Sequence, residues 1–212
     1  MFLRQISRQT PRITSSVSKL VRPGVATNAV NATSTRSMAS AGAAIKSLAV
    51  ESPHVDVIRY EHKNLKFTLK HVDYHAEAFA NGLLESGLAP GDVVLSWLPL
   101  HFAEQHILQF ACSKAGFVLY NLDPSLATTN PDAAKTALAK ALEITEANAL
   151  IFQEAGDDVN YIRLVEGVIP ETRIFNFDDG MHFITPRFPH LRLPIHTGFE
   201  YADRSGMIPL YD

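Results

Sequence analysis

One stretch, residues 68–124, constrains the fold of this 212-residue chain more than any other. Thr68 is the expected N-cap of a helix whose apolar residues at helical spacing end at Gly87, and an apolar strand at 93–98 follows a Pro-Gly turn. A second helix at 101–115 and a second apolar strand at 117–122 come next. Strands that are apolar throughout are typical of parallel sheets covered on both faces. The stretch therefore predicts a βαβ unit preceded by a helix.

The flanking segments extend this pattern. Two alternating runs around a polar turn predict a hairpin over 55–67. Further on, helices are expected at 132–146 and 158–167, and strands at 149–152 and 172–177. Alternating strands and helices predict an α/β layered domain, with a parallel sheet of about four strands and helices on its faces. An N-terminal hairpin and an irregular C-terminal arm complete the predicted architecture.

The chain divides into four expected parts: a leader at 1–40, a linker at 41–54, the α/β domain at 55–180 and an arm at 181–212. The arm is rich in Pro and aromatic residues and has no clear period, so we expect it to pack against something else. Exposed apolar groups of this kind mark partner surfaces, whereas in a longer chain they would belong to a core. The candidate partner surface, for other protein subunits, comprises Phe188, Phe199, Tyr201 and Tyr211.

The leader has the composition of a mitochondrial transit peptide. It is rich in Arg, Ser and Thr, and no acidic residue occurs before Glu51. We expect cleavage between Arg36 and Ala39 and a location in the matrix or on the matrix face of the inner membrane. A disordered basic tail and a plastid address remain as alternatives.

The rest of the chain is acidic. All 22 Asp and Glu residues lie from Glu51 onward, which argues against a nucleic-acid surface because no basic patch can form. No apolar run reaches the roughly 18 residues that a membrane span needs, although peripheral attachment stays open. The single cysteine, Cys112, excludes an internal disulfide and a Cys-rich zinc site.

Several titratable residues are candidates for a functional site. His71 and His75 have a spacing that two metal ligands could use, but a solvated helix face is favoured. Asp92 could serve as a general base, yet its place after Gly91 favours turn chemistry. The pairs at 157–158 and 178–179 could bind magnesium or cap local structure, and capping is favoured. Cys112 is expected to be a buried, inert thiol rather than a nucleophile.

Six short motifs stand in a fixed order: Phe67-Thr68, the segments 82–88 and 90–94, Leu98-Pro99, and the segments 114–116 and 121–124. In this order they resemble the N-terminal subdomain of the adenylate-forming acyl-CoA synthetases. The segment 188–198 is also similar to mitochondrial medium-chain acyl-CoA ligases. The resemblance covers about residues 55–198.

These motifs correspond to the scaffold of that family and not to its chemistry. The resemblance implies ATP, Mg²⁺ and CoA as cofactors, held by a Gly-rich loop with Lys and by later segments. The nearest mimic here, 196–200, lacks the second Gly, the Pro and the Lys. We therefore expect no site residues, no cofactor and no metal for this chain alone, and a non-catalytic scaffold or accessory subunit. The alternative is a truncated or split part of a fatty-acid:CoA ligase, an acid–thiol ligase.

Overall fold

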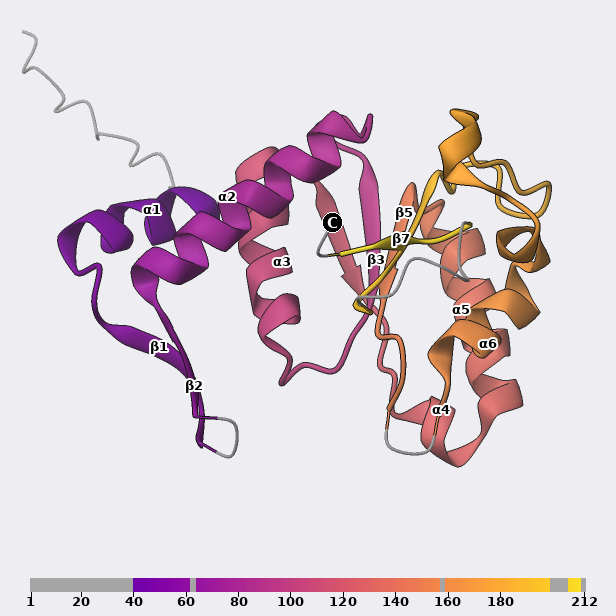
Figure 1. Cartoon of the computed structure of the whole chain (residues 1–212), viewed down its shortest axis with the longest axis horizontal. Coiled ribbons are helices and arrows are strands. Elements are labelled where there is room, and N and C mark those ends of the chain that lie inside the picture. Colours follow the sequence, from indigo (N-terminus) through magenta and orange to yellow (C-terminus); the bar gives the residue numbers. More distant parts are fainter. Residues whose placement is uncertain (1–39, 62–63, 157–158, 199–205, 211–212) are drawn as a thin grey trace, which may run out of the picture. The chain divides into compact units, whose positions relative to one another are not determined.

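The computed structural model describes residues 40–61, 64–156, 159–198 and 206–210 (Figure 1). Its elements are α1 (Ala41–Glu51), β1 (Asp56–Tyr60), β2 (Leu65–Thr68), α2 (Leu69–Glu85), β3 (Val93–Trp97), α3 (Ala103–Ala115), β4 (Val118–Asn121), α4 (Leu126–Thr129), α5 (Pro131–Thr145), β5 (Ala149–Phe152), α6 (Tyr161–Val168), the 3-10 turns η2 (Pro170–Arg173) and η3 (Phe177–Asp179), β6 (Leu193–His196) and β7 (Ile208–Pro209). None of the described helices is long and apolar enough to cross a bilayer.

The sheet is parallel throughout, with strand order β4-β3-β5-β6-β7. This confirms the predicted α/β layered fold, with five strands where about four were expected. The predicted hairpin is also present, because β1 and β2 pair antiparallel, with a bulge next to Asp56.

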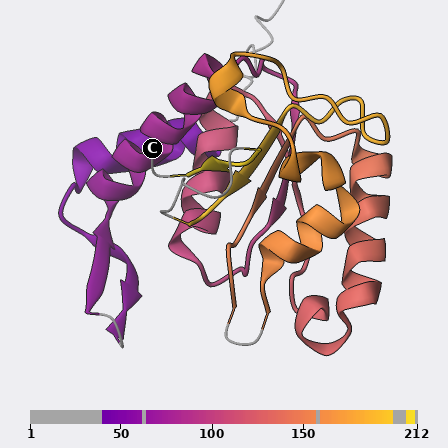
Figure 2. The same ribbon diagram turned by 45° about the vertical axis from the view of Figure 1, so that its right-hand side comes forward.

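Helices cover both faces of the sheet (Figure 2). Successive strand residues point to opposite faces, so Val94 and Ile151 pack with α2 and α3, while Leu95 and Leu150 pack with α5 and α6. The four strand residues are at most 1% exposed. Burial on both faces explains why β3 and β5 show no polar alternation in the sequence.

The predicted helix ends are confirmed at α2 and α3. Thr68 caps α2, since its Oγ1 accepts a hydrogen bond from His71 N at 3.3 Å. At the other end Gly87 has φ +92° and Leu88 N donates to Leu83 O at 3.1 Å, which forms a Schellman turn. Gly116, with φ +78°, ends α3 in the left-handed region. These glycines therefore end helices.

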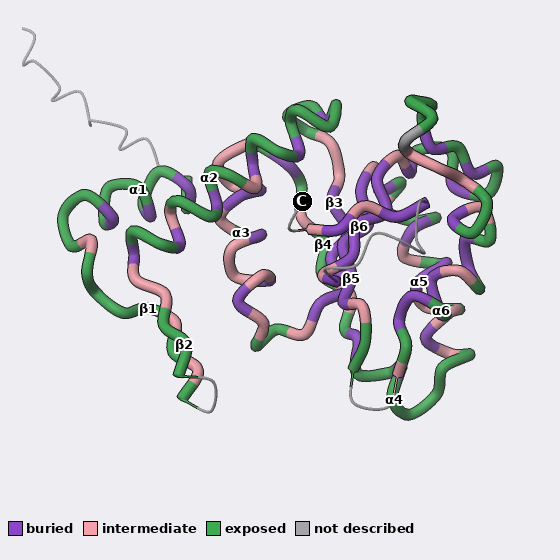
Figure 3. The backbone as a smooth tube through the Cα atoms, viewed as in Figure 1, coloured by how far each residue is buried: buried purple, intermediate pink, exposed green. Residues whose placement is uncertain are grey.

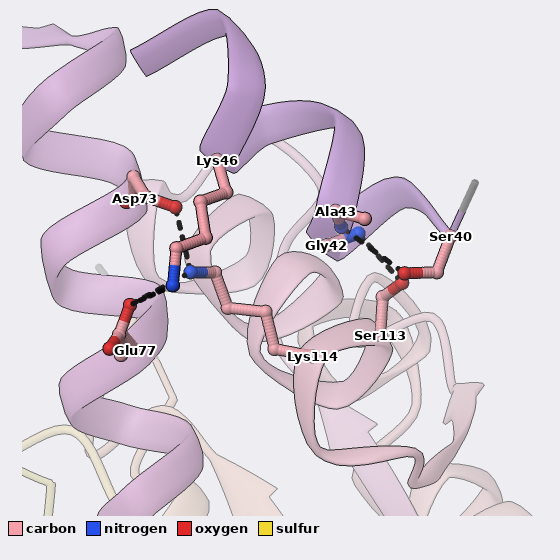
Figure 4. Close-up of polar contacts among 8 residues, drawn as sticks. All are labelled: Ser40, Gly42, Ala43, Lys46, Asp73, Glu77, Ser113 and Lys114. Atoms are coloured by element: carbon pink, nitrogen blue, oxygen red, sulfur yellow. Dashed lines mark hydrogen bonds and ion pairs between the residues drawn. The ribbon is translucent and has the colours of Figure 1, made fainter. Parts of the chain in front are cut away.

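The expected linker at 41–54 is wrong, because most of it forms α1. Gly42, Ile45 and Ala49 are buried where α1 packs on α2 and α3. Gly42 N donates to Ser113 Oγ at 2.9 Å, so the first turn of α1 is tied directly to α3 (Figure 4). The segment is rich in Ala, which has high helix propensity, and its small side chains let two helices approach closely.

An ion cluster joins the same three helices (Figure 4). Lys114 Nζ on α3 lies 2.7 Å from Asp73 Oδ1 and 3.2 Å from Glu77 Oε2 on α2. Lys46 Nζ on α1 lies 4.0 Å from Glu77. Burial alone would lower the pKa of Lys114, but its hydrogen bonds to Asp73 and Glu77 outweigh that effect and raise the pKa.

The expected strand at 172–177 is also wrong. The 3-10 turn η2 begins at Pro170, and the buried Thr172 Oγ1 donates to Ile169 O at 2.7 Å. Phe175 packs edge-to-face on Phe177 and Phe183, with ring centroids 4.9 and 5.2 Å apart. An apolar run that looked like a strand is therefore an aromatic cluster under an irregular segment.

The arm at 181–212 contributes strands to the sheet, which differs from the expected irregular arm. Its β6 pairs with β5, and β7 pairs with β6. Pro194 is tolerated within β6 for a geometric reason. The N–H groups of Leu193 and Thr197 donate to the β5 side, to Asn148 O and Phe152 O, so the position of the missing Pro194 N–H faces away from β5.

Candidate functional site

The carboxyl ends of β3 and β5 mark the place where this topology would hold a ligand. The chain leaves β3 toward α3 on one face and leaves β5 toward α6 on the other face. Neighbouring strands whose connections diverge in this way bound the crevice that doubly wound folds use for binding. The residues at this edge therefore form the candidate site.

Tyr161, the first residue of α6, occupies the edge between β3 and β5. Asn160 caps the helix, because its Oδ1 accepts a hydrogen bond from Arg163 N at 3.0 Å. The Tyr161 ring is 2% exposed and packs edge-to-face on Trp97 of β3, with centroids 5.1 Å apart. Its hydroxyl donates to Pro124 O at 3.2 Å, and burial raises its pKa. The side chain thus bridges both sides of the crevice.

A network of side-chain hydrogen bonds joins β3, α3 and β4. The Ser96 hydroxyl donates to Gln105 Oε1, and Gln105 Nε2 donates to Asn121 Oδ1 at 2.8 Å. Gln105 is completely buried. These polar groups satisfy one another, so they hold α3 against the strand ends instead of facing a ligand.

The β5–β6 side of the edge is equally closed. His196 is fully buried, and its Nδ1 accepts a hydrogen bond from Gly198 N at 3.0 Å, which assigns the neutral ring's proton to Nε2. Glu154 N donates to Thr197 Oγ1 at 3.3 Å. A Cβ on Gly198 would collide with the Glu154 carboxylate. Among the described residues, closely packed protein atoms occupy this end of the sheet.

The histidines singled out in the sequence serve local structure. His71 Nδ1 accepts from Thr68 N at 3.5 Å and completes a capping box, and His71 and His75 are both exposed. His75 stacks edge-to-face against Tyr74 at 5.4 Å. Within the described residues, no group of three His, Cys, Asp or Glu side chains could hold a metal ion.

Asp92 is a turn residue, as favoured from the sequence, with a partner that the sequence did not reveal. Its Oδ2 accepts from Ala89 N at 2.8 Å and lies 2.6 Å from the Arg192 guanidinium. Arg192 also donates to Gly87 O at 3.1 Å. A residue 100 positions away therefore clamps the α2–β3 turn, and sequence spacing carries no signal for such a contact.

The remaining candidates are Cys112 and the two acidic pairs at 157–158 and 178–179. Cys112 is buried, which confirms the predicted burial of its thiol, and burial raises its pKa to about 12. Asp179 lies exposed in η3. The pair at 157–158 lies outside the described residues.

Phe188 does not form an exposed partner surface, because it is only 4% exposed and belongs to the core under α5 and α6. Phe199, Tyr201 and Tyr211 lie outside the described residues. The exposed apolar side chains near the arm are aliphatic instead: Ile174, Met181 and Ile184, at 86%, 62% and 72%. Of the four residues predicted to form the surface, only Phe188 is described, and its ring packs inward.

Comparison with known proteins agrees with this fold. Residues 46–174, more than half of the chain, match the family described as AMP-binding enzyme. YngI of Bacillus subtilis (strain 168), whose name places it among the acyl-CoA synthetases, is 28% identical over 146 residues. That match covers 69% of this chain and 25% of YngI.

Two solved structures share the fold. The acetoacetyl-CoA synthetase from Streptomyces lividans superimposes with a TM-score of 0.62 at 17% identity, over 81% of this chain and 24% of that one. The Mycobacterium tuberculosis fatty acyl CoA synthetase gives 0.51 at 20% identity, over 65% and 24%. The chain thus spans about a quarter of the length of these relatives. On the family match and the shared fold, the chain belongs to the AMP-binding enzyme family.

Proposed function

We propose that these 212 residues act as a non-catalytic mitochondrial protein, derived from the N-terminal part of an AMP-dependent acyl-CoA synthetase. Its role is that of a scaffold or accessory subunit in a larger mitochondrial assembly. One observation carries the proposal: in the part of the chain that the structure describes, the carboxyl edge of the sheet holds the buried Tyr161 and His196 and the Ser96–Gln105–Asn121 network. A domain whose crevice is occupied by its own side chains is better suited to binding other proteins through its surface than to binding a small ligand.

The residues at this edge do not fit a nucleotide. Phosphate groups are held by Gly-rich backbone loops and Lys, and the 212 residues contain no such loop. Among the described residues of this edge, Tyr161 is buried and Gly198 lies tightly against the Glu154 carboxylate, which does not favour an adenine or a ribose there. ATP, Mg²⁺ and CoA are therefore not assigned to this chain alone.

Isothermal titration tests the non-catalytic role. The chain is titrated with ATP and Mg²⁺ and with a non-hydrolysable acyl-adenylate, and full-length YngI serves as the control for active reagents. We expect no heat of binding for the chain. Saturable binding at micromolar concentration would refute the proposal.

The mitochondrial location is supported by the acid-free, Arg-rich leader. Import of the radiolabelled chain into isolated mitochondria, followed by N-terminal sequencing, tests it directly. We expect a mature protein that begins at 37–40. A chain that remains protease-sensitive outside the organelle, or starts at Met1, contradicts the location.

A second candidate is the front part of a fatty-acid:CoA ligase, completed by further residues of the same or another chain. It is favoured by the coverage of about a quarter of each relative. Peptides that continue beyond Asp212 into a Gly-rich phosphate loop would establish it. ATP, Mg²⁺ and CoA would then be cofactors of the completed acid–thiol ligase.

A further inference from the structure

Strand β4 forms one end of the five-stranded sheet and pairs only with β3 among the described residues. Three of its four residues are exposed, in contrast to the fully buried β5 (Figure 3). The strand is short, but it ends a sheet whose other strands have covered faces. An edge of this kind presents unpaired backbone groups.

The hydrogen bonds of β4 show which backbone groups face outward. Val118 N donates to Asp92 O at 2.9 Å, and Leu122 N donates to Ser96 O at 2.8 Å, both on the β3 side. Because alternate residues of a strand direct their N–H and C=O groups to opposite sides, those of Leu119 and Asn121 point away from β3. The free edge therefore offers two donors and two acceptors at regular spacing.

The side chains of β4 do not protect this edge. Val118 and Tyr120 are 43% and 48% exposed, and they lie beside Val93 and Leu95, whose side chains belong to the core under α5 and α6. Soluble proteins usually protect an edge strand with Lys, Pro, a bulge or an inward-pointing charge. The sequence Val-Leu-Tyr-Asn contains no charged residue and no Pro, and its register with β3 is regular.

We propose that β4 is the docking edge for an extended strand of a partner protein, which adds a sixth strand to the sheet. This inference rests on the proposed accessory role and names its contact surface. Backbone groups at strand spacing select another strand as the occupant, and apolar residues at alternate positions of that strand would cover Val118 and Tyr120.

A second copy of the chain is the less suitable occupant. Stable interfaces bury about 800 Å² on each partner, and self-pairing of two four-residue strands covers only a small part of that area. A different protein can extend from the added strand over the neighbouring surface. The interface would then include the exposed Val118 and Tyr120 side chains at its centre.

Hydrogen exchange distinguishes strand addition from other contacts. The full chain is compared alone and within the assembly purified from mitochondria, with single-amide resolution. Val118 and Tyr120 amides should be protected in both samples, because they bond to β3. Leu119 and Asn121 amides should exchange rapidly in the free chain and at least tenfold more slowly in the assembly. Rapid exchange at both positions in the assembly, or slow exchange in the free chain, would overturn the proposal.

Surface variants provide the matched test. Tyr120→Lys and Val118→Lys place a charge on the edge, whereas Ile144→Lys changes a side chain that is 80% exposed on α5. Blue-native electrophoresis should show the first two variants as free chain, and Ile144→Lys and wild type in the assembly, at unchanged melting temperatures. Edge variants that remain in the assembly, or a wild type seen only as a homodimer, refute the docking edge. A wild type that binds ATP in titration refutes the proposed function instead.

Discussion

Two glycine-to-alanine substitutions should change stability in opposite directions, and the pair tests how α1 is packed. Gly42 lies in α1 and Gly82 lies within α2. A Cβ added at Gly42 would lie 2.7 Å from Lys114 Cγ, 2.8 Å from Lys114 N and 3.0 Å from Lys114 Cα. A Cβ added at Gly82 would meet no atom within 4 Å.

The magnitudes follow from these distances. Alanine is favoured over glycine in a helix interior by about 1 kcal/mol, so Gly82→Ala should raise the free energy of unfolding by up to that amount. At Gly42 two of the contacting atoms are backbone, which cannot rotate away, so α1 must shift from α3. Overpacking of this kind costs about 1–3 kcal/mol and exceeds any gain in propensity. Displacement also lengthens the Gly42 N to Ser113 Oγ hydrogen bond.

Thermal and urea unfolding of the full chain measure both effects. For a protein of this size, 1 kcal/mol corresponds to about 2–4 °C in melting temperature. We expect a lower melting temperature for Gly42→Ala and a higher one for Gly82→Ala, with unchanged urea m-values. Equal or higher stability of Gly42→Ala would show that α1 does not pack on α3 as described.

Three further predictions concern contacts between distant segments. Arg192→Met should lower the free energy of unfolding by about 1 kcal/mol at low salt, because it removes the ion pair with Asp92. The loss should be smaller at high salt, because the ion pair is partly exposed and salt screens it. Urea titrations at two salt concentrations measure both values. Cys112 should react with a thiol reagent only after unfolding. Burial raises the pKa of Cys112 to about 12, so only the unfolded thiol ionises between about pH 9 and pH 12. The free energy of unfolding should therefore fall as pH rises through this range, by up to about 1.4 kcal/mol per pH unit. A Cys112→Ala variant should lack this slope. Tyr161→Phe should cost about 1 kcal/mol in thermal unfolding, since it removes the hydrogen bond to Pro124 O, and an unchanged melting temperature would contradict the bridge.

The elements predicted from local patterns were the reliable part. Strand 149–152 matches β5 in full, and the Thr68 and Gly87 signals placed both ends of α2. Such features depend on neighbouring residues, because capping, turn conformation and apolar runs are local properties. The family resemblance rests on the same local motifs and is confirmed by the family match.

The predictions from the sequence are wrong where contacts between residues far apart in the chain decide the structure. Residues 41–51 resemble a linker in the sequence. They form the packed helix α1 because Ser113 and Lys114, some 70 positions away, provide a surface for it. Likewise Phe188 looks like an exposed anchor in the sequence, but it packs in the core under α5 and α6 and is only 4% exposed. In both cases the deciding contact lies far outside any sequence window.

Sequence alone thus determined the class of fold and, apart from α4, the order of the helices and strands from β1 to α6, because periodicity, turn residues and motifs lie in short segments. Tertiary structure decided that α1 belongs to the domain, that Arg192 clamps the α2–β3 turn, and that Tyr161 and His196 fill the carboxyl edge. These features depend on side chains brought together by the parallel sheet, and their energies come from close packing and burial, which no local pattern records.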